Sequence, residues 1–151
     1  MISIFEKVTK IKKDSILILV GDGKQKKKIE SMVKEKALCD NVLFFNTSTD
    51  VTPYLNAADV YVSTSEFEGF GISVAEAQFN SLSCVISKGF PKEINLFGRC
   101  TFLSLKDSSK IWAEAITSIS REKEIPKEKL YSSEHDIKNT VNFLTEFYHS
   151  K

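Results

Sequence analysis

The stretch "DVYVSTSEFEGFGISVAEAQF", residues 59–79, contains the features that decide the fold. Its first seven residues include valines, a tyrosine and a threonine between turn-forming neighbours, which favours a strand over 59–65. A loop with two glycines follows, and residues 70–79 return to the helical spacing of apolar side chains. A strand that passes through a glycine loop into a helix is typical of a parallel α/β sheet, so this stretch predicts an α/β protein.

Strand and helix patterns alternate along the rest of the chain in the same way. The predicted strands are 15–20, 41–45, 59–65, 83–87 and 100–105, and the predicted helices are 2–11, 24–38, 50–58, 70–79, 108–119 and 136–149. The continuous apolar run at 15–20 is typical of a strand buried on both faces. This order predicts a doubly wound, Rossmann-like parallel sheet, in which ligands bind at the carboxyl ends of the strands. Segments 21–23, 45–47, 63–71 and 87–89 follow strands and are therefore the candidate ligand-binding segments.

Single residues support several of these elements. Asp50 can cap the helix at 50–58, and Pro53 falls in its first turn, where proline is tolerated. Trp112 lies in an amphipathic pattern within 108–119, which predicts core packing.

Composition limits the class of protein. At 151 residues and 42% apolar content, residues 1–151 are expected to form one domain with a core of its own. The net charge of +1 gives no general attraction for nucleic acid or an anionic membrane. Three cysteines without CxxC spacing favour free thiols in a reducing compartment such as the cytoplasm. No window reaches the roughly 18 apolar residues of a membrane span, although work at a membrane surface stays compatible with the sequence.

The loop before the helix at 70–79 is suited to a phosphate group. Gly69 and Gly71 carry no Cβ, so the backbone can approach a ligand closely. The first amides of a helix have no partners within it and, with the helix dipole, attract anionic oxygens. We therefore expect the amides of Gly69, Phe70, Gly71 and Ile72 to meet a phosphate or a neighbouring ligand oxygen.

Two glutamates flank this loop. Glu68 precedes it, and Glu76 lies close to an apolar stripe formed by Ile72, Ala75 and Phe79, where a bare carboxylate costs several kcal/mol unless donors meet it. Carboxylates accept hydroxyl hydrogen bonds strongly, so the pair fits a ligand with phosphates in its middle and sugar hydroxyls on either side. A nucleotide sugar has this arrangement. In the alternative, Glu68 caps the helix and Glu76 pairs with a lysine on a solvated edge.

A family resemblance points the same way. "EGFGISVAEA", together with "SILILVGDG", "NVLFF", "YLNAADVYVSTS" and "CVIS" in the same order, resembles the C-terminal, donor-binding half of GT-B glycosyltransferases of family 4, the group 1 type. The match runs from residue 1 to about residue 105, and "EAQFNSLSCVIS" followed by "PKEINL" resembles bacterial exopolysaccharide and capsule enzymes.

The resemblance implies a role for each candidate residue. It implies that Glu68, the catalytic candidate, contacts the sugar hydroxyls of the donor and that Glu76 holds the ribose hydroxyls. It places the loop amides at the donor phosphates and sugar, and it places the turn with Phe45 and Asn46 near the base. Gly21, which follows the strand at 15–20, is a further donor-binding candidate. The implied reaction is a retaining, metal-independent hexosyl transfer from a UDP- or GDP-linked sugar to a polysaccharide or lipid-linked acceptor, without a cofactor.

The sequence departs from the family pattern at several points. It begins just past the first strand and loop, whose arginine and lysine neutralise the leaving diphosphate in the family, and it lacks the N-terminal acceptor domain. Lys24 and Lys26 follow a different strand and are poor substitutes. We therefore expect this chain to be inactive alone, and to need the missing domain or a partner chain that carries it. Ser81 and Asn46 replace usual glycines, and serine at 81 predicts an altered turn after the helix.

Other classes of function are less well supported by the residues. A non-catalytic nucleotide-sugar-binding module or remnant remains the alternative, and a nucleotide-sugar epimerase is weaker because its further catalytic groups are missing. "GDGKQKKK" has neither the Gly-Lys-Ser/Thr of a phosphate loop nor the spacing of a dinucleotide fingerprint. Its lysines form either a solvated helix face or a rim that steers anionic ligands. His135 and His149 have no companions at ligand spacing, so no metal is expected.

Overall fold

A computed structural model describes residues 1–120, 125–126, 128 and 137–149. The elements follow the alternation that the sequence predicts. In chain order they are α1 (Ile2–Ile11), β1 (Leu17–Val20), α2 (Lys26–Glu35), β2 (Val42–Phe45), α3 (Thr52–Ala57), β3 (Val60–Ser63), α4 (Ile72–Phe79), β4 (Ser83–Ser87), η1 (Lys92–Ile94), β5 (Cys100–Leu103), α5 (Ser109–Ser118) and α7 (Ile137–His149).

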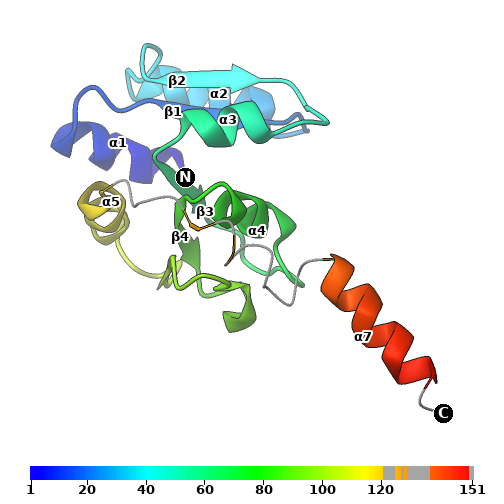
Figure 1. Ribbon diagram of the computed structural model, residues 1–151. Coiled ribbons are helices and arrows are strands. Elements are labelled where there is room, and N and C mark those ends of the chain that lie inside the picture. Colours follow the sequence, from blue (N-terminus) through cyan, green and yellow to red (C-terminus); the bar gives the residue numbers. More distant parts are fainter. Residues whose placement is uncertain (121–124, 127, 129–136, 150–151) are drawn as a thin grey trace.

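All strand pairs are parallel, but they form two sheets. One sheet has the order β1-β2, with Leu17 opposite Val42. The other has the order β3-β4-β5, with Val60 opposite Ser83 and Cys84 opposite Cys100. Figure 1 shows the two-stranded sheet with α2 and α3 above the three-stranded sheet, and the N-terminus between them.

The helices pack on both faces and connect the two sheets. One core cluster joins α3 and α4 to β4 and contains Leu55, Val74 and Ile86. A second joins α1 and α2 to β1 and β2. In a third, Ile4 of α1 packs with Val85 of β4 and Trp112 of α5, so α1 contacts the cores of both sheets. The layers are those of a doubly wound α/β fold.

Most predicted elements are confirmed, and the ends of several differ. β4 and α1 have their predicted bounds, while the other predicted strands and helices within residues 1–120 are shorter. Pro53 lies in the first turn of α3, and the Asp50 carboxylate accepts the N–H of Thr52 at 2.9 Å, which lowers the pKa of Asp50. Trp112 is buried, and its indole N–H donates to the Ser104 carbonyl at 3.0 Å. His135 and the start of the last predicted helix lie outside the described residues.

Two burial predictions are wrong. β1 is half-buried, with Val20 at its exposed end, because its second edge has no strand beside it among the described residues. In α4 the buried residues are Val74, Ala75, Ala77 and Gln78, while Ile72 is 70% exposed. The face of α4 that packs on the sheet is therefore different from the predicted one, and Glu76 lies on the exposed face of the helix.

The buried Gln78 explains how α4 tolerates a polar side chain against the sheet. Its amide donates to the carbonyls of Ile94 at 2.6 Å and Val74 at 3.3 Å, and its oxygen accepts the N–H of Phe97. Buried polar groups are stable when hydrogen-bonded in this way. The side chain therefore joins α4 to the segment after η1.

The helices α2 and α4 end in the same turn. Ala37 and Ser81 have φ values of 53° and 64°, in the left-handed region. In each case the next residue, Leu38 or Leu82, donates its N–H back to the carbonyl five residues earlier, which is the Schellman motif. The prediction of an altered turn at Ser81 is wrong, because Ser81 is held by the Ile125 N–H and the Arg99 guanidinium. Asn46, by contrast, does not have a positive φ.

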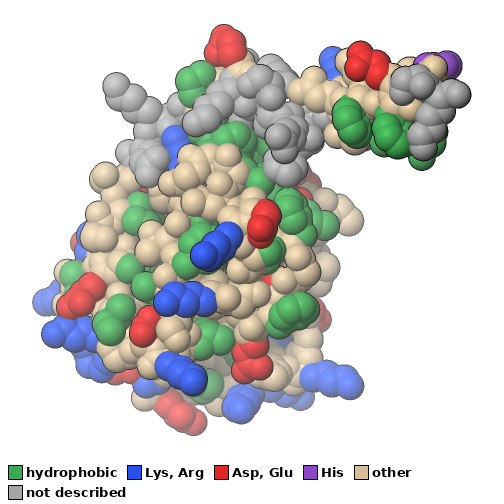
Figure 2. Space-filling model, turned by 90° about the horizontal axis from the view of Figure 1, so that it is seen from below, with side chains coloured by type: hydrophobic (Ala, Val, Ile, Leu, Met, Phe, Trp, Pro, Cys, Tyr) green, Lys and Arg blue, Asp and Glu red, His purple; other side chains and the backbone are tan. Residues whose placement is uncertain are grey.

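The surface carries mixed charge. Figure 2 shows lysines and acidic residues scattered over one face, with hydrophobic side chains gathered along α7. That helix projects from the rest of the molecule (Figure 1) and has no buried residue. Among the described residues, no helix is long and apolar enough to cross a membrane.

Candidate donor-binding site

The loop between β3 and α4 presents backbone amides that the protein does not use. Gly71 has a φ of 93° and precedes the first helical residue, and its carbonyl accepts the N–H groups of Val74 and Ala75. Within the described part of the chain, the N–H groups of Gly69, Gly71 and Ile72 donate to no protein acceptor. They lie at the positive end of the α4 dipole, where an anionic oxygen is stabilised.

Glu68 is held in place by the segments around it. Its carboxylate accepts the Ser65 hydroxyl at 2.8 Å, and its N–H donates to the Gly89 carbonyl at 3.1 Å. The Ser87 hydroxyl in turn donates to the Ser65 carbonyl and accepts the Gly89 N–H at 3.1 Å. These bonds connect the loop after β3 to the loop after β4. The position of Glu68 therefore depends on the segments that follow both strands.

Glu76 lies beside two hydroxyls. Ser73, one helical turn earlier, accepts the Tyr61 hydroxyl at 2.9 Å, and Tyr61, Ser73 and Glu76 line the same cavity. Burial raises the pKa of Tyr61, the hydrogen bond with Ser73 opposes this shift, and the charges of Glu68 and Glu76 add to the rise. Both glutamates therefore act on the same phenol, although Glu68 does not line this cavity.

The alternative roles of the two glutamates are not seen. The Glu68 side chain does not cap α4. Within the described residues, the Glu76 carboxylate has no hydrogen bond or ion pair, with a lysine or otherwise. Glu76 is exposed, so the desolvation cost expected from the sequence does not arise in this state. Its acceptor oxygens are available to a ligand.

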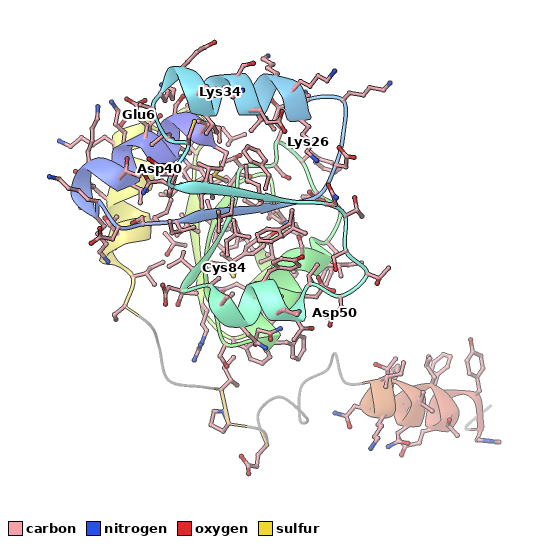
Figure 3. The ribbon with its side chains drawn as sticks, turned by 90° about the horizontal axis from the view of Figure 1, so that it is seen from above. Glu6, Lys26, Lys34, Asp40, Asp50 and Cys84 are labelled. Carbon is pink, nitrogen blue, oxygen red and sulfur yellow. The ribbon has the colours of Figure 1, made fainter. Side chains whose placement is uncertain are left out.

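Gly21, Phe45 and Asn46 form a second group, at the carboxyl ends of β1 and β2. Gly21 donates its N–H to the Phe45 carbonyl at 3.0 Å, and the Lys26 ammonium donates to Asn46 Oδ1 at 3.1 Å. Figure 3 labels Lys26 at the start of α2. The Phe45 ring is partly exposed and packs on Tyr54, with ring centroids 4.9 Å apart. An exposed aromatic face beside an amide is suited to a planar ring.

A cavity of about 1100 Å³ is lined by Glu76 but by neither Glu68 nor the loop glycines. It lies between the two sheets and reaches from Glu76 and Ser73 to Val20 and Tyr54. Gly21, Phe45 and Asn46 are outside its lining, although Val20, which precedes Gly21, and Tyr54, which packs on Phe45, belong to it. Gly21, Phe45, Asn46 and Glu68 thus lie after the carboxyl ends of strands, Glu76 lies within α4, and one cavity does not enclose them all.

Sequence reasoning missed Tyr61, Ser73 and the bonds through Ser87 and Gly89. Ser73 could have been found, because it precedes Glu76 by three residues and shares its face of the helix. Chemically, the arrangement offers free amides for an anion, two carboxylates for hydroxyls, and an aromatic ring. Among the described residues, no three His, Cys, Asp or Glu side chains gather as a metal site.

The fold is that of a Rossmann-like half of a GT-B glycosyltransferase. Two solved structures are similar: TarM, with a TM-score of 0.71 and 24% identity, and Anabaena HepE in complex with UDP, with a TM-score of 0.65 and 23% identity. Each comparison covers 78% of this chain, and 24% and 34% of the other chain respectively.

The chain belongs to the family described as glycosyl transferases group 1, whose model matches residues 1–136. It is 31% identical over 137 residues to the putative glycosyltransferase EpsF of Bacillus subtilis, covering 87% of this chain and 36% of that protein. The chain therefore spans about a third of the length of this curated relative. The expected family and fold are confirmed.

Proposed function

We propose that residues 1–151 form the donor-binding part of a retaining glycosyltransferase, which moves a hexose from a UDP- or GDP-linked sugar to a polysaccharide or lipid-linked acceptor. The observation that carries the proposal is the set of unused amides at Gly69, Gly71 and Ile72 with a carboxylate on each side. Diphosphate oxygens bind the amides, which the α4 dipole assists. The family membership and the UDP complex of the similar HepE support a nucleotide sugar as the ligand.

The two carboxylates have different roles in this proposal. Glu76, whose oxygens have no protein partner among the described residues, accepts hydrogen bonds from the ribose hydroxyls. Glu68, fixed by Ser65 and Gly89, contacts the transferred sugar next to the reacting bond. The exposed ring of Phe45, with Asn46 beside it, packs on the base. No metal takes part, because the amides and helix dipole meet the diphosphate.

The acceptor side is proposed to come from outside residues 1–151. A transferase also needs groups that bind the acceptor and cations that neutralise the leaving diphosphate. We propose that an N-terminal domain or partner chain supplies them, that residues 1–151 alone do not catalyse transfer, and that the reaction takes place in the cytoplasm, at the inner face of a membrane when the acceptor is lipid-linked. The three free cysteines support a reducing compartment.

Calorimetry with UDP, GDP and their sugars tests the site. Glu76→Ala should weaken nucleoside diphosphate binding by about 1.5–3 kcal/mol, the range for a hydrogen bond to a charged group. Glu68→Ala should weaken binding of the nucleotide sugar more than that of the bare nucleotide. Glu114→Ala is the matched control, because Glu114 is an exposed helical glutamate on α5. Unchanged affinity in Glu76→Ala would refute the ribose role, and equal losses in Glu68→Ala would refute its sugar contact.

A further inference from the structure

Two of the three cysteines are neighbours on adjacent strands of the sheet β3-β4-β5. Cys84 of β4 lies opposite Cys100 of β5 in the parallel register, and the Cys84 N–H donates to the Arg99 carbonyl at 2.8 Å. The two side chains lie on the same face of the sheet, because Cys84 belongs to the core cluster under α4 and Cys100 packs against that cluster. Both cysteines are free thiols, so the fold holds a pair of reduced sulfurs side by side.

The spacing of the two strands is close to the spacing that a disulfide needs. Neighbouring strands lie about 4.7–4.9 Å apart, and the Cα atoms of a disulfide lie about 4.4–6.8 Å apart. The two thiols are already hydrogen-bonded to each other. The Cβ atoms of a disulfide lie about 3.5–4.5 Å apart, so bond formation requires a small approach of one strand to the other. The strand β5 has room for this movement, because within the described chain it pairs with β4 alone.

The two thiols differ in burial and in acidity. Cys84, which Figure 3 labels, is 0% exposed, whereas Cys100 is half-buried. The hydrogen bond from the Cys84 thiol lowers the pKa of Cys100, and the same bond together with burial raises the pKa of Cys84. The Leu82 carbonyl, at 3.8 Å, is a second acceptor for the Cys84 proton. Because the thiolate is the reactive form of cysteine, Cys100 is the sulfur that reacts first and Cys84 is the sulfur that completes the bond.

We propose that Cys84 and Cys100 form a reversible disulfide when the chain meets hydrogen peroxide. The Cys100 thiolate attacks one peroxide oxygen, the O–O bond breaks, and the hydroxide that leaves takes up a proton to become water. Cys100 is then a sulfenic acid. The Cys84 sulfur attacks the Cys100 sulfur, the S–S bond forms, and the S–O bond breaks while the Cys84 proton leaves with that oxygen as a second water. The two sulfurs are oxidised and the two peroxide oxygens are reduced, and a dithiol reverses the reaction by thiol–disulfide exchange.

The disulfide would close the loop formed by residues 85–99. This loop of about 15 residues includes Gly89, whose carbonyl accepts the Glu68 N–H. Closing a loop of this length restricts the unfolded chain and therefore stabilises the folded one. Oxidation should thus raise the stability of the chain and restrain the segment that supports Glu68. The formation of the bond does not depend on the proposed donor ligand.

Peroxide treatment of the full chain with the substitution Cys39→Ser tests the proposal, since the exposed Cys39 thiol would otherwise cross-link two chains. Without denaturant, peroxide should remove two hydrogen atoms from the mass of the protein, and a proteolytic digest should yield one disulfide-linked pair of peptides that contains Cys84 and Cys100. The melting temperature should rise by several degrees. Excess dithiothreitol should restore the original mass and melting temperature.

Two matched variants on the same background separate the roles of the sulfurs. Cys84→Ala leaves Cys100 without a neighbouring thiol, so peroxide should produce a sulfenic acid that dimedone traps. Cys100→Ala removes the more acidic thiol, so the oxidation of Cys84 should slow by about tenfold or more. An equal oxidation rate for Cys84 with and without Cys100 would refute the assignment of Cys100 as the first sulfur to react.

Two results with the unsubstituted pair would overturn the proposal, and neither depends on the folding of a variant of Cys84 or Cys100. In the first, peroxide converts Cys100 to a sulfinic or sulfonic acid and leaves Cys84 as a thiol. In the second, the linked peptides appear only after urea has unfolded the chain, which would mean that the folded strands do not bring the sulfurs close enough to bond.

Discussion

Replacing Gly89 by alanine tests whether the loop after β4 positions Glu68. A Cβ at Gly89 would lie 2.3 Å from the Glu66 carbonyl oxygen, 2.6 Å from its carbon and 2.9 Å from the Ser65 oxygen. All three are backbone atoms, so no side-chain rotation can relieve the contacts. The segment that precedes Glu68 has to move, and the bond from the Glu68 N–H to the Gly89 carbonyl moves with it.

The cost follows from these two effects. Overpacking against fixed atoms costs about 1–3 kcal/mol, and a weakened backbone hydrogen bond costs about 0.5–1.5 kcal/mol. The sum of about 1.5–4.5 kcal/mol corresponds to a fall in melting temperature of about 3–18 °C for a chain of this size. Gly89→Ala should also weaken nucleotide-sugar binding more than bare nucleotide binding, because Glu68 is displaced.

Urea titrations measure the loss of stability, and binding calorimetry measures the loss of affinity for the nucleotide sugar. Gly23→Ala is the control, because a Cβ at Gly23 meets nothing within 4 Å and its φ is not positive. That variant should stay within about 0.5 kcal/mol of the unchanged chain. If Gly89→Ala were as stable as Gly23→Ala and bound the donor equally well, the proposed dependence of Glu68 on the β4 loop would be wrong.

Three further predictions concern packing and charge. Gln78→Leu should lower the free energy of unfolding by about 1–3 kcal/mol in urea titrations, because the buried carbonyl of Ile94 and N–H of Phe97 lose their partner; an unchanged midpoint would contradict this. Gly71→Ala should cost at least about 1–2 kcal/mol in the same titrations, since its φ of 93° disfavours a side chain and the new Cβ would lie 2.6 Å from the Phe90 ring; full stability would show that the turn adapts freely. The Glu6 carboxylate accepts hydrogen bonds from the ammonium groups of Lys36 at 2.5 Å and Lys10 at 3.3 Å. These bonds lower the pKa of Glu6 from 4.5 to about 2. Its stabilising contribution is therefore present above pH 4.5 and lost as the pH falls toward 2, and Glu6→Gln should show a flatter stability curve between pH 5 and 2; parallel curves for the two proteins would refute the linkage.

Local patterns predicted the order of elements because each helix and strand has its own periodicity. β4 has its predicted bounds because "SCVIS" is apolar throughout its middle and is buried on both faces. The same rule was wrong for β1, whose burial depends on a neighbouring strand rather than on its own composition. In α4, the spacing of Ile72, Ala75 and Phe79 and that of Val74, Ala77 and Gln78 are equally helical. Only the packing against β4 decides which set is buried.

The candidate site was predictable where it depends on local backbone and not where it depends on distant contacts. The glycines before α4 indicated free helix amides without tertiary information. The support of Glu68 by Gly89 joins segments about twenty residues apart, and the Tyr61–Ser73 bond joins a strand to a helix. Neither pairing has a signature in one sequence, so the geometry was needed to find them.

The turns at Ala37 and Ser81 couple the ends of α2 and α4 to global unfolding. A residue other than glycine in the left-handed region costs about 1–2 kcal/mol, yet each turn is followed by a leucine, Leu38 or Leu82, that is 4% exposed. Burial of a leucine contributes about 1.5–3 kcal/mol, which offsets the cost. Fraying of either helix end would expose the buried leucine that follows it to solvent. Proteases and exchange catalysts should therefore reach these two ends only when the surrounding core opens.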